Sequence, residues 1–197
     1  MVYEPREDSY LLAKNVAYFA SGKVLEIGTG SGIQAISAIK SKKVSSVLAV
    51  DINPKALTHA KNHNNHPGIT YKKSNMFGSV KGKFDTILFN PPYLPNDPRV
   101  KDIALDGGPK GYEVTERFLA DVGSHLTEKG KVLLLFSSLT KKKKVEEFLE
   151  HYCFDWKKLD SQKLPFEILY VYELRKKIIV GKLAKKKVTE LVSFTKG

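Results

Sequence analysis

The chain has 197 residues, 42% hydrophobic and 10% aromatic, a composition typical of one globular domain with a sizeable core. No stretch approaches the ~20 apolar residues of a membrane helix, and the single cysteine, Cys153, excludes an internal disulfide and a cysteine metal cluster. The first residues have no signal-peptide character, so we expect a cytoplasmic protein with neither a membrane segment nor a metal site.

The formal net charge of +12 invites a nucleic-acid interpretation. Only four of the 33 basic residues are arginine, however, and arginine is the side chain suited to bidentate reading of guanine or phosphate. Lysine runs at 141–144 and 185–187 are typical of solvated surfaces. Nonspecific contact with RNA through these lysines stays open.

Apolar runs and turn signals alternate along the chain in the pattern that gives a parallel sheet with helices on both faces. Residues 1–175 are expected to form one domain, with 176–197 as its basic extension. Residues 152–160 are a candidate further strand, and 178–180 a candidate edge strand. The other expected strands are 23–27, 47–51, 69–73, 84–89, 131–137 and 167–174, and the expected helices are 8–20, 32–41, 54–64, 112–126 and 141–150.

The first expected strand ends in a glycine-rich turn with Gly28, Gly30 and Gly32 at alternate positions. Such glycines let the backbone approach a ligand closely, and the amino terminus of the next helix supplies unpaired N–H donors. The spacing Gly-x-Gly-x-Gly is not the Gly-x-Gly-x-x-Gly that cradles a dinucleotide, which disfavours a nicotinamide-dependent dehydrogenase.

The second expected strand ends in Asp51, about one βαβ unit after the glycines. An acid at this position can accept hydrogen bonds from both hydroxyls of a ribose. The alternative is a cap for the helix that begins near Pro54, although Asn53 is well suited to that role. Both roles can coexist, with Asn53 capping the helix and Asp51 binding a ligand.

The apolar run 86–89 is followed by Asn90-Pro91-Pro92-Tyr93, at the place where a buried strand meets solvent. Two prolines cannot extend the ladder, and they hold Asn90 extended at the carboxyl end of the strand. The Asn90 amide oxygen and the Pro91 carbonyl can then converge on one planar NH2 group, on which Tyr93 can stack. The motif therefore predicts a receptor for an amide or an aromatic amine; the alternative is a strand-ending turn.

These motifs resemble the class I S-adenosylmethionine-dependent methyltransferases, and within them the HemK-like group that methylates a glutamine amide in translation release factors. The resemblance covers residues 2–175 and implies a Rossmann-like fold with a mostly parallel seven-stranded sheet and an antiparallel terminal hairpin. Its most specific parts are 4–9, 26–32, Asp51, 90–93, and 105–108 with Gly111. The segment Leu105-Asp106-Gly107-Gly108 separates this group from DNA adenine methyltransferases, which share the Asn-Pro-Pro-Tyr motif.

The resemblance implies S-adenosylmethionine as cofactor, S-adenosylhomocysteine as product, and a set of site residues. Asp8 either faces the methionine end of the cofactor or is a helix cap or surface charge, and Glu26 accepts from the cofactor ammonium or orders a water. Asn75 stands where the group has Asp, and its oxygen can still accept from the adenine amino group. The implied catalytic residues are Asn90, Pro91 and Tyr93, the substrate contacts Asn90, Pro92 and Tyr93, and the cofactor contacts Asp8, Glu26, Gly28, Gly30, Gly32, Asp51, Asn75 and Asn90.

The implied activity is methyl transfer to the glutamine of a release factor's Gly-Gly-Gln loop. Three alternatives stay open: an N6-adenine or N2-guanine nucleic-acid methyltransferase, a protein lysine methyltransferase, and a non-catalytic module that keeps the fold. The chain looks like the short archaeal and eukaryotic form, which resembles enzymes that work with a small zinc-binding activator. We expect that partner at the edge strand 69–73, unless Lys72 and Lys73 protect this edge.

Overall fold

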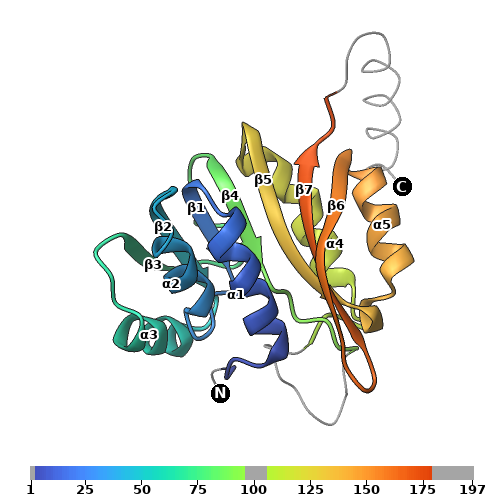
Figure 1. Cartoon of the computed structure of the whole chain (residues 1–197), viewed down its shortest axis with the longest axis horizontal. Helices are drawn as coiled ribbons and strands as arrows, with labels where there is room; N and C mark the ends of the chain where they lie inside the picture. The colour runs from blue at the N-terminus through green and yellow to red at the C-terminus, as the bar shows by residue number, and fades with distance from the viewer. Residues whose placement is uncertain (1–2, 96–105, 179–197) are drawn as a thin grey trace.

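The computed structural model describes residues 3–95 and 106–178 and forms a seven-stranded sheet in the order β3-β2-β1-β4-β5-β7-β6 (Figure 1). The strands from β3 to β5 are parallel, whereas β7 runs antiparallel to both β5 and β6. The predicted fold class is therefore confirmed. The strands are β1 (Gly22–Ile27), β2 (Val44–Asp51), β3 (Ile69–Lys73), β4 (Phe84–Phe89), β5 (Leu126–Ser137), β6 (Phe154–Lys163) and β7 (Ile168–Lys176).

Helices cover both faces of the sheet, so the central strands are apolar on both sides. The helices are α1 (Glu7–Phe19), α2 (Ile33–Ile39), α3 (Pro54–His63), α4 (Glu113–Val122) and α5 (Lys142–His151), with 3-10 turns η1 (Gly123–His125) and η2 (Ser138–Thr140). In β1, Leu25 and Ile27 belong to the hydrophobic cluster that includes residues of α4 and α5, whereas Val24 belongs to the cluster that includes residues of α1 and α2. This division follows from the alternation of side chains along a strand.

Two predicted boundaries were wrong around the fifth strand. The helix expected to reach residue 126 ends at Val122, and β5 begins at Leu126 instead of residue 131. Leu126 is fully buried and pairs with Phe84, and the register shifts before the next pair of residues. The strand therefore extends through a segment that has the sequence of a polar turn, because the apolar side chain of Leu126, beyond the register shift, is buried.

The expected strand after α5 is present as β6, shifted to Phe154–Lys163. Of the candidate edge strand 178–180, Ile178 lies outside any strand, and 179–180 are outside the described residues. The division of the chain at residue 175 stays a prediction. Among the described residues, no helix has the length and apolar character needed to cross a membrane.

The order of the sheet explains where a ligand site arises. The chain passes from β1 to β2 and β3 in one direction and then returns to place β4 on the other side of β1. In open α/β sheets, ligands bind outside the carboxyl ends of the strands at such a reversal. The glycine turn after β1, Asp51 at the end of β2 and Asn90 after β4 therefore meet at one edge of the sheet.

Candidate active site

A cavity of about 810 Å³ opens at the carboxyl ends of β1, β2 and β4. Asp8 and Ser9 of α1 also line it, as do residues of α2, α3 and α4. Of the residues predicted from the sequence, it brings together all except Gly32. These residues are Asp8, Glu26, Gly28, Gly30, Asp51, Asn75, Asn90, Pro91, Pro92 and Tyr93.

The glycine turn serves two purposes. Gly30 has a φ of 52°, a backbone conformation that favours glycine, and a Cβ added there would meet nothing within 4 Å, so this side of the turn is open. Gly32 has a φ of 83°, and its Cβ would lie 3.0 Å from the Cβ of Ala60 on α3. Gly32 is not among the residues that line the cavity, so we interpret it as a packing glycine.

Asp51 is tied to the glycine turn from the neighbouring strand. Its Oδ2 accepts a hydrogen bond of 2.9 Å from Gly30 N, and its Oδ1 accepts one of 2.8 Å from Asn53 N. The cap of α3 is Asn53, whose side chain accepts from Lys55 N at 3.0 Å. The helix-capping role thus falls to Asn53 as predicted, and the half-buried Asp51 carboxylate keeps lone pairs for a ligand.

Glu26 is the buried acid of the cavity. Only 2% of it is exposed, and it accepts a hydrogen bond of 2.7 Å from Thr29 Oγ1. Burial raises the pKa of Glu26 to about 8, because the charged form loses its hydration. A cationic group that enters the cavity would favour the ionised form, so this acid suits a ligand with an ammonium.

This burial predicts a pH dependence of stability. Between pH 4.5 and about 8 the folded protein keeps a proton on Glu26 that the unfolded chain has released, so stability is lost as pH rises through this range. The slope reaches about 1.4 kcal/mol per pH unit. Urea unfolding of wild type and Glu26→Gln, which mimics the protonated acid, is expected to diverge from pH 5 to 8; parallel curves would contradict the raised pKa.

Asn90 has one anchored and one unpaired end. Its Nδ2 donates a hydrogen bond of 2.9 Å to Asp8 Oδ2, a residue 82 positions earlier in the chain. Its Oδ1 is buried and accepts no hydrogen bond from any residue that the structure describes. A buried acceptor without a partner costs about 1–3 kcal/mol, a cost that an incoming N–H donor removes.

Asp8 is neither a helix cap nor a surface charge. It is 4% exposed, and its Oδ1 accepts from Ser9 N at 2.7 Å and from Tyr3 Oη at 3.0 Å. The cap position of α1 is occupied by Arg6, which makes no side-chain capping bond. Asp8 therefore acts inside the cavity, where its Oδ2 contacts Asn90.

The Asp106-Gly107-Gly108 segment packs directly behind the Asn-Pro-Pro-Tyr loop. Gly107 N donates to Leu94 O at 2.8 Å. A Cβ on Gly107 would lie 2.9 Å from both Pro92 O and Tyr93 Cα, and one on Gly111 would lie 2.7 Å from Tyr93 O. The sequence marked this segment only by family resemblance; the spacing of its glycines is the signal that points to close backbone packing. Leu105 is outside the described residues.

Sequence reasoning also missed Gln34. This residue is 4% exposed, lines the cavity, and its Nε2 donates to Ser9 O at 2.9 Å, which joins α2 to the start of α1. The available signal was a polar residue between the apolar Ile33 and Ala35 of an expected helix. Tyr93, by contrast, is where it was expected, and burial raises the pKa of its hydroxyl.

The fold and the cavity define a class I S-adenosylmethionine-dependent methyltransferase. Residues 6–164 match the methyltransferase small domain, and the chain belongs to this family. The chain is 41% identical over 177 residues to MJ0928 of Methanocaldococcus jannaschii, which carries a provisional name as a protein N5-glutamine methyltransferase; the match covers 86% of this chain and 89% of the relative.

A bacterial relative and a solved structure agree with this assignment. The release factor glutamine methyltransferase of Agrobacterium fabrum is 31% identical over 151 residues, which cover 66% of this chain and 52% of the relative, so the chain spans about half of that protein. The structure of the E. cuniculi Mtq2–Trm112 complex, responsible for methylation of the termination factor eRF1, has a chain with a TM-score of 0.72 and 28% identity. The match covers 89% of this chain and 98% of that one.

Proposed function

We propose that this chain methylates the side-chain amide nitrogen of a glutamine in a translation release factor, in the cytoplasm. The observation that carries the proposal is Asn90, which presents an unpaired buried oxygen beside the cavity while its NH2 group is held by Asp8. An oxygen in this state suits a substrate that brings N–H donors. The glutamine as target is supported by relatives that are named for this activity.

The chemical problem is that an amide nitrogen is a poor nucleophile, since its lone pair is delocalised into the carbonyl. Asn90 Oδ1 and the Pro91 carbonyl are two oxygens that can accept the two N–H bonds of the substrate amide and turn its lone pair toward the methyl group. They also stabilise the positive charge that develops on nitrogen. The proton is then lost from a more acidic, methylated nitrogen, so no general base is required.

S-adenosylmethionine supplies an electrophilic methyl group on a sulfonium when bound. The residues around the cavity fit its parts, since a buried acid, an exposed amide and a carboxylate lie along one cavity. Glu26 would hold the ammonium, Asp51 the ribose hydroxyls, and Asn75 the adenine amino group. Gly28 and Gly30 leave the backbone accessible beside the methionine part.

Transfer of labelled methyl from S-adenosylmethionine to purified release factor and to bulk RNA, side by side, tests the proposal. We expect label on the factor that disappears when the glutamine of its Gly-Gly-Gln loop is replaced. Label on RNA alone would mean that Asn90 binds the amine of a nucleobase instead of a glutamine amide. The 33 basic residues would then attract the RNA nonspecifically. Label on neither substrate would contradict the proposed function.

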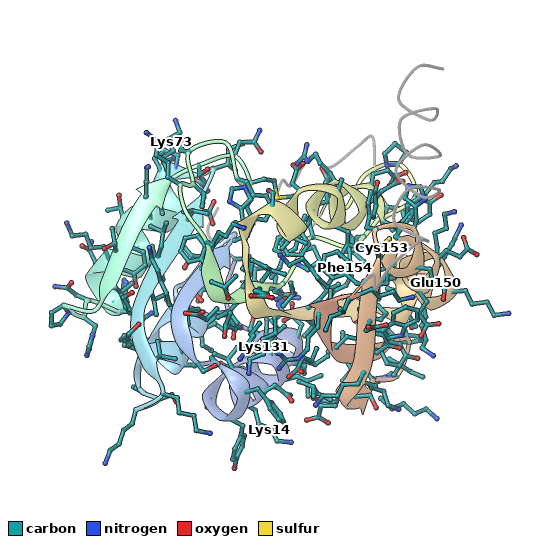
Figure 2. The ribbon with its side chains drawn as sticks, turned by 90° about the horizontal axis from the view of Figure 1, so that it is seen from above. Lys14, Lys73, Lys131, Glu150, Cys153 and Phe154 are labelled. Carbon is teal, nitrogen blue, oxygen red and sulfur yellow. The ribbon has the colours of Figure 1, made fainter. Side chains whose placement is uncertain are left out.

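We also propose that a small zinc-binding protein adds a strand to β3. Among the described residues β3 pairs only with β2, and Figure 2 shows Lys73 at one end of the sheet, far from Phe154 at the other. Gly68 O and Ser74 N bond to β2, so alternation turns the backbone groups of Tyr71 and Lys73 outward. The similar Mtq2 chain, which was solved with Trm112, supports a partner of this kind.

Lys73→Pro is expected to abolish activation by the partner, because proline removes an outward N–H while its ring remains compatible with an edge strand. Lys73→Ala removes the same side chain but keeps the N–H, so it should retain activation and serves as the matched control. Partner binding by calorimetry and methyl transfer with and without the partner provide the measurements. Equal loss in both variants would assign the contact to the lysine side chain instead of the strand edge.

A further inference from the structure

We propose that Asp8 is a positioning residue that fixes which end of the Asn90 amide faces the substrate. The inference deepens the proposed function and rests on it. The two ends of an asparagine amide have nearly the same shape, but only the oxygen accepts hydrogen bonds. Because a carboxylate only accepts, Asp8 Oδ2 selects the NH2 end of Asn90, at 2.9 Å, and leaves Oδ1 for the substrate.

Asp8 is itself held in place by two donors, of which the backbone N–H of Ser9 cannot act as an acceptor. The backbone N–H of Ser9 donates to Asp8 Oδ1 at 2.7 Å, and the Tyr3 hydroxyl donates to the same oxygen at 3.0 Å. The start of α1 is in turn tied to α2, since Gln34 Nε2 donates to Ser9 O at 2.9 Å. The carboxylate is therefore fixed with one oxygen toward α1 and the other toward Asn90.

This arrangement predicts the effect of Asp8→Asn, which changes one oxygen to NH2 with little change in shape. Ser9 N can only donate, so the remaining oxygen stays on that side and the new NH2 group faces Asn90. Asn90 must then rotate its amide to offer oxygen to residue 8, which turns its own NH2 toward the substrate. Two NH2 groups facing each other cannot form a hydrogen bond, so the receptor is inverted while the fold is preserved.

We expect Asp8→Asn to lower kcat at least about 100-fold, the loss typical for removal of one preorganised polar contact to the reacting group. The dissociation constant for S-adenosylmethionine, measured by calorimetry, should stay unchanged. In an Asn90→Ala background, Asp8→Asn should have no further effect, because the two residues act as a unit. Full additivity, or a loss of cofactor affinity with unchanged kcat, would overturn the inference and make Asp8 a direct cofactor contact.

Asp160→Asn is the matched control. Asp160 also accepts from an asparagine amide, with its Oδ2 3.2 Å from Asn15 Nδ2, but it lies on β6 and does not line the cavity. This variant should keep the kcat of the wild type. An equal loss of kcat in both variants would show that disruption of any such pair lowers activity, and would overturn the specific role of Asp8.

A measurement on the wild-type protein keeps the inference testable if a variant fails to fold. In a sample labelled with 15N at asparagine, the side-chain NH2 signal of Asn90 is identified by its absence in Asn90→Ala. Held by Asp8, its protons should exchange with water more slowly than those of exposed asparagines; exchange at the same rate would overturn the inference.

If the wild type methylates neither the factor nor RNA, the proposed function fails, whereas an active wild type with a fully active Asp8→Asn variant refutes only the inference.

Discussion

Asn90→Ala is expected to lower kcat by at least two orders of magnitude, with cofactor affinity retained. The substitution removes a buried side-chain oxygen at the cavity that accepts no hydrogen bond from the described residues. A preorganised polar contact of this kind typically contributes about 100-fold or more to kcat, because it stabilises charge that develops only in the transition state. Single-turnover methyl transfer and calorimetric titration with S-adenosylmethionine separate the two effects.

Asp51→Ala provides the opposite control. Asp51 lies at the end of β2 and is proposed to hold the ribose, so its loss should weaken cofactor binding, by about 10-fold or more if one charge-assisted hydrogen bond of ~1.5–3 kcal/mol is removed. Saturating cofactor should then restore much of kcat. A normal turnover in Asn90→Ala, or restoration of its activity by excess cofactor, would contradict the proposed mechanism.

Local patterns were sufficient to predict most of the strands and most of the cavity, and the family resemblance supplied the seven-stranded sheet with its antiparallel hairpin. Apolar runs end at Ile27, Val50 and Phe89, and the polar or glycine residues that follow such runs meet wherever parallel strands share an edge. The N-cap of α3 was also predictable, because Asn53-Pro54 is a local signal. The function rested on the same motifs, through their resemblance to the HemK-like group.

What could not be predicted depends on contacts between distant segments. The hydrogen bond from Asn90 to Asp8 joins residues 82 positions apart, and no local pattern reports it. The packing role of Gly32 depends on Ala60 of α3, and the early start of β5 depends on the pairing of Leu126 with Phe84. In each case the local sequence does not favour one structure over another, and contacts with distant residues determine which one forms.

The receptor around Asn90 is therefore shaped from two sides. Asp8 on α1 fixes the amide at the start of the Asn-Pro-Pro-Tyr loop, and Gly107 supports the backbone of its other end. Neither segment belongs to β4, the strand that precedes Asn90. This explains why a short motif that also occurs elsewhere as an ordinary turn acquires a defined geometry in this fold.

Gly107→Ala is expected to lower kcat at least about 10-fold, because a displacement of the loop moves both Tyr93 and the proline carbonyls. The added Cβ would lie 2.7 Å from Gly111 O and 2.9 Å from Pro92 O, and backbone atoms on both sides leave no flexible side chain to yield. Overpacking of this kind also costs typically about 1–3 kcal/mol of stability. Methyl-transfer kinetics and urea unfolding measure the two effects.

Gly123→Ala is the matched control for this substitution. Gly123 has a φ of −58°, and the nearest atom to its added Cβ is Phe154 Cζ at 3.8 Å, an ordinary van der Waals contact. Activity and stability should both be kept, since alanine fits this backbone conformation and loses less entropy on folding. If Gly107→Ala were as active as Gly123→Ala, the close packing behind the loop would have no part in positioning Tyr93, and the Asp106-Gly107-Gly108 segment would need another explanation.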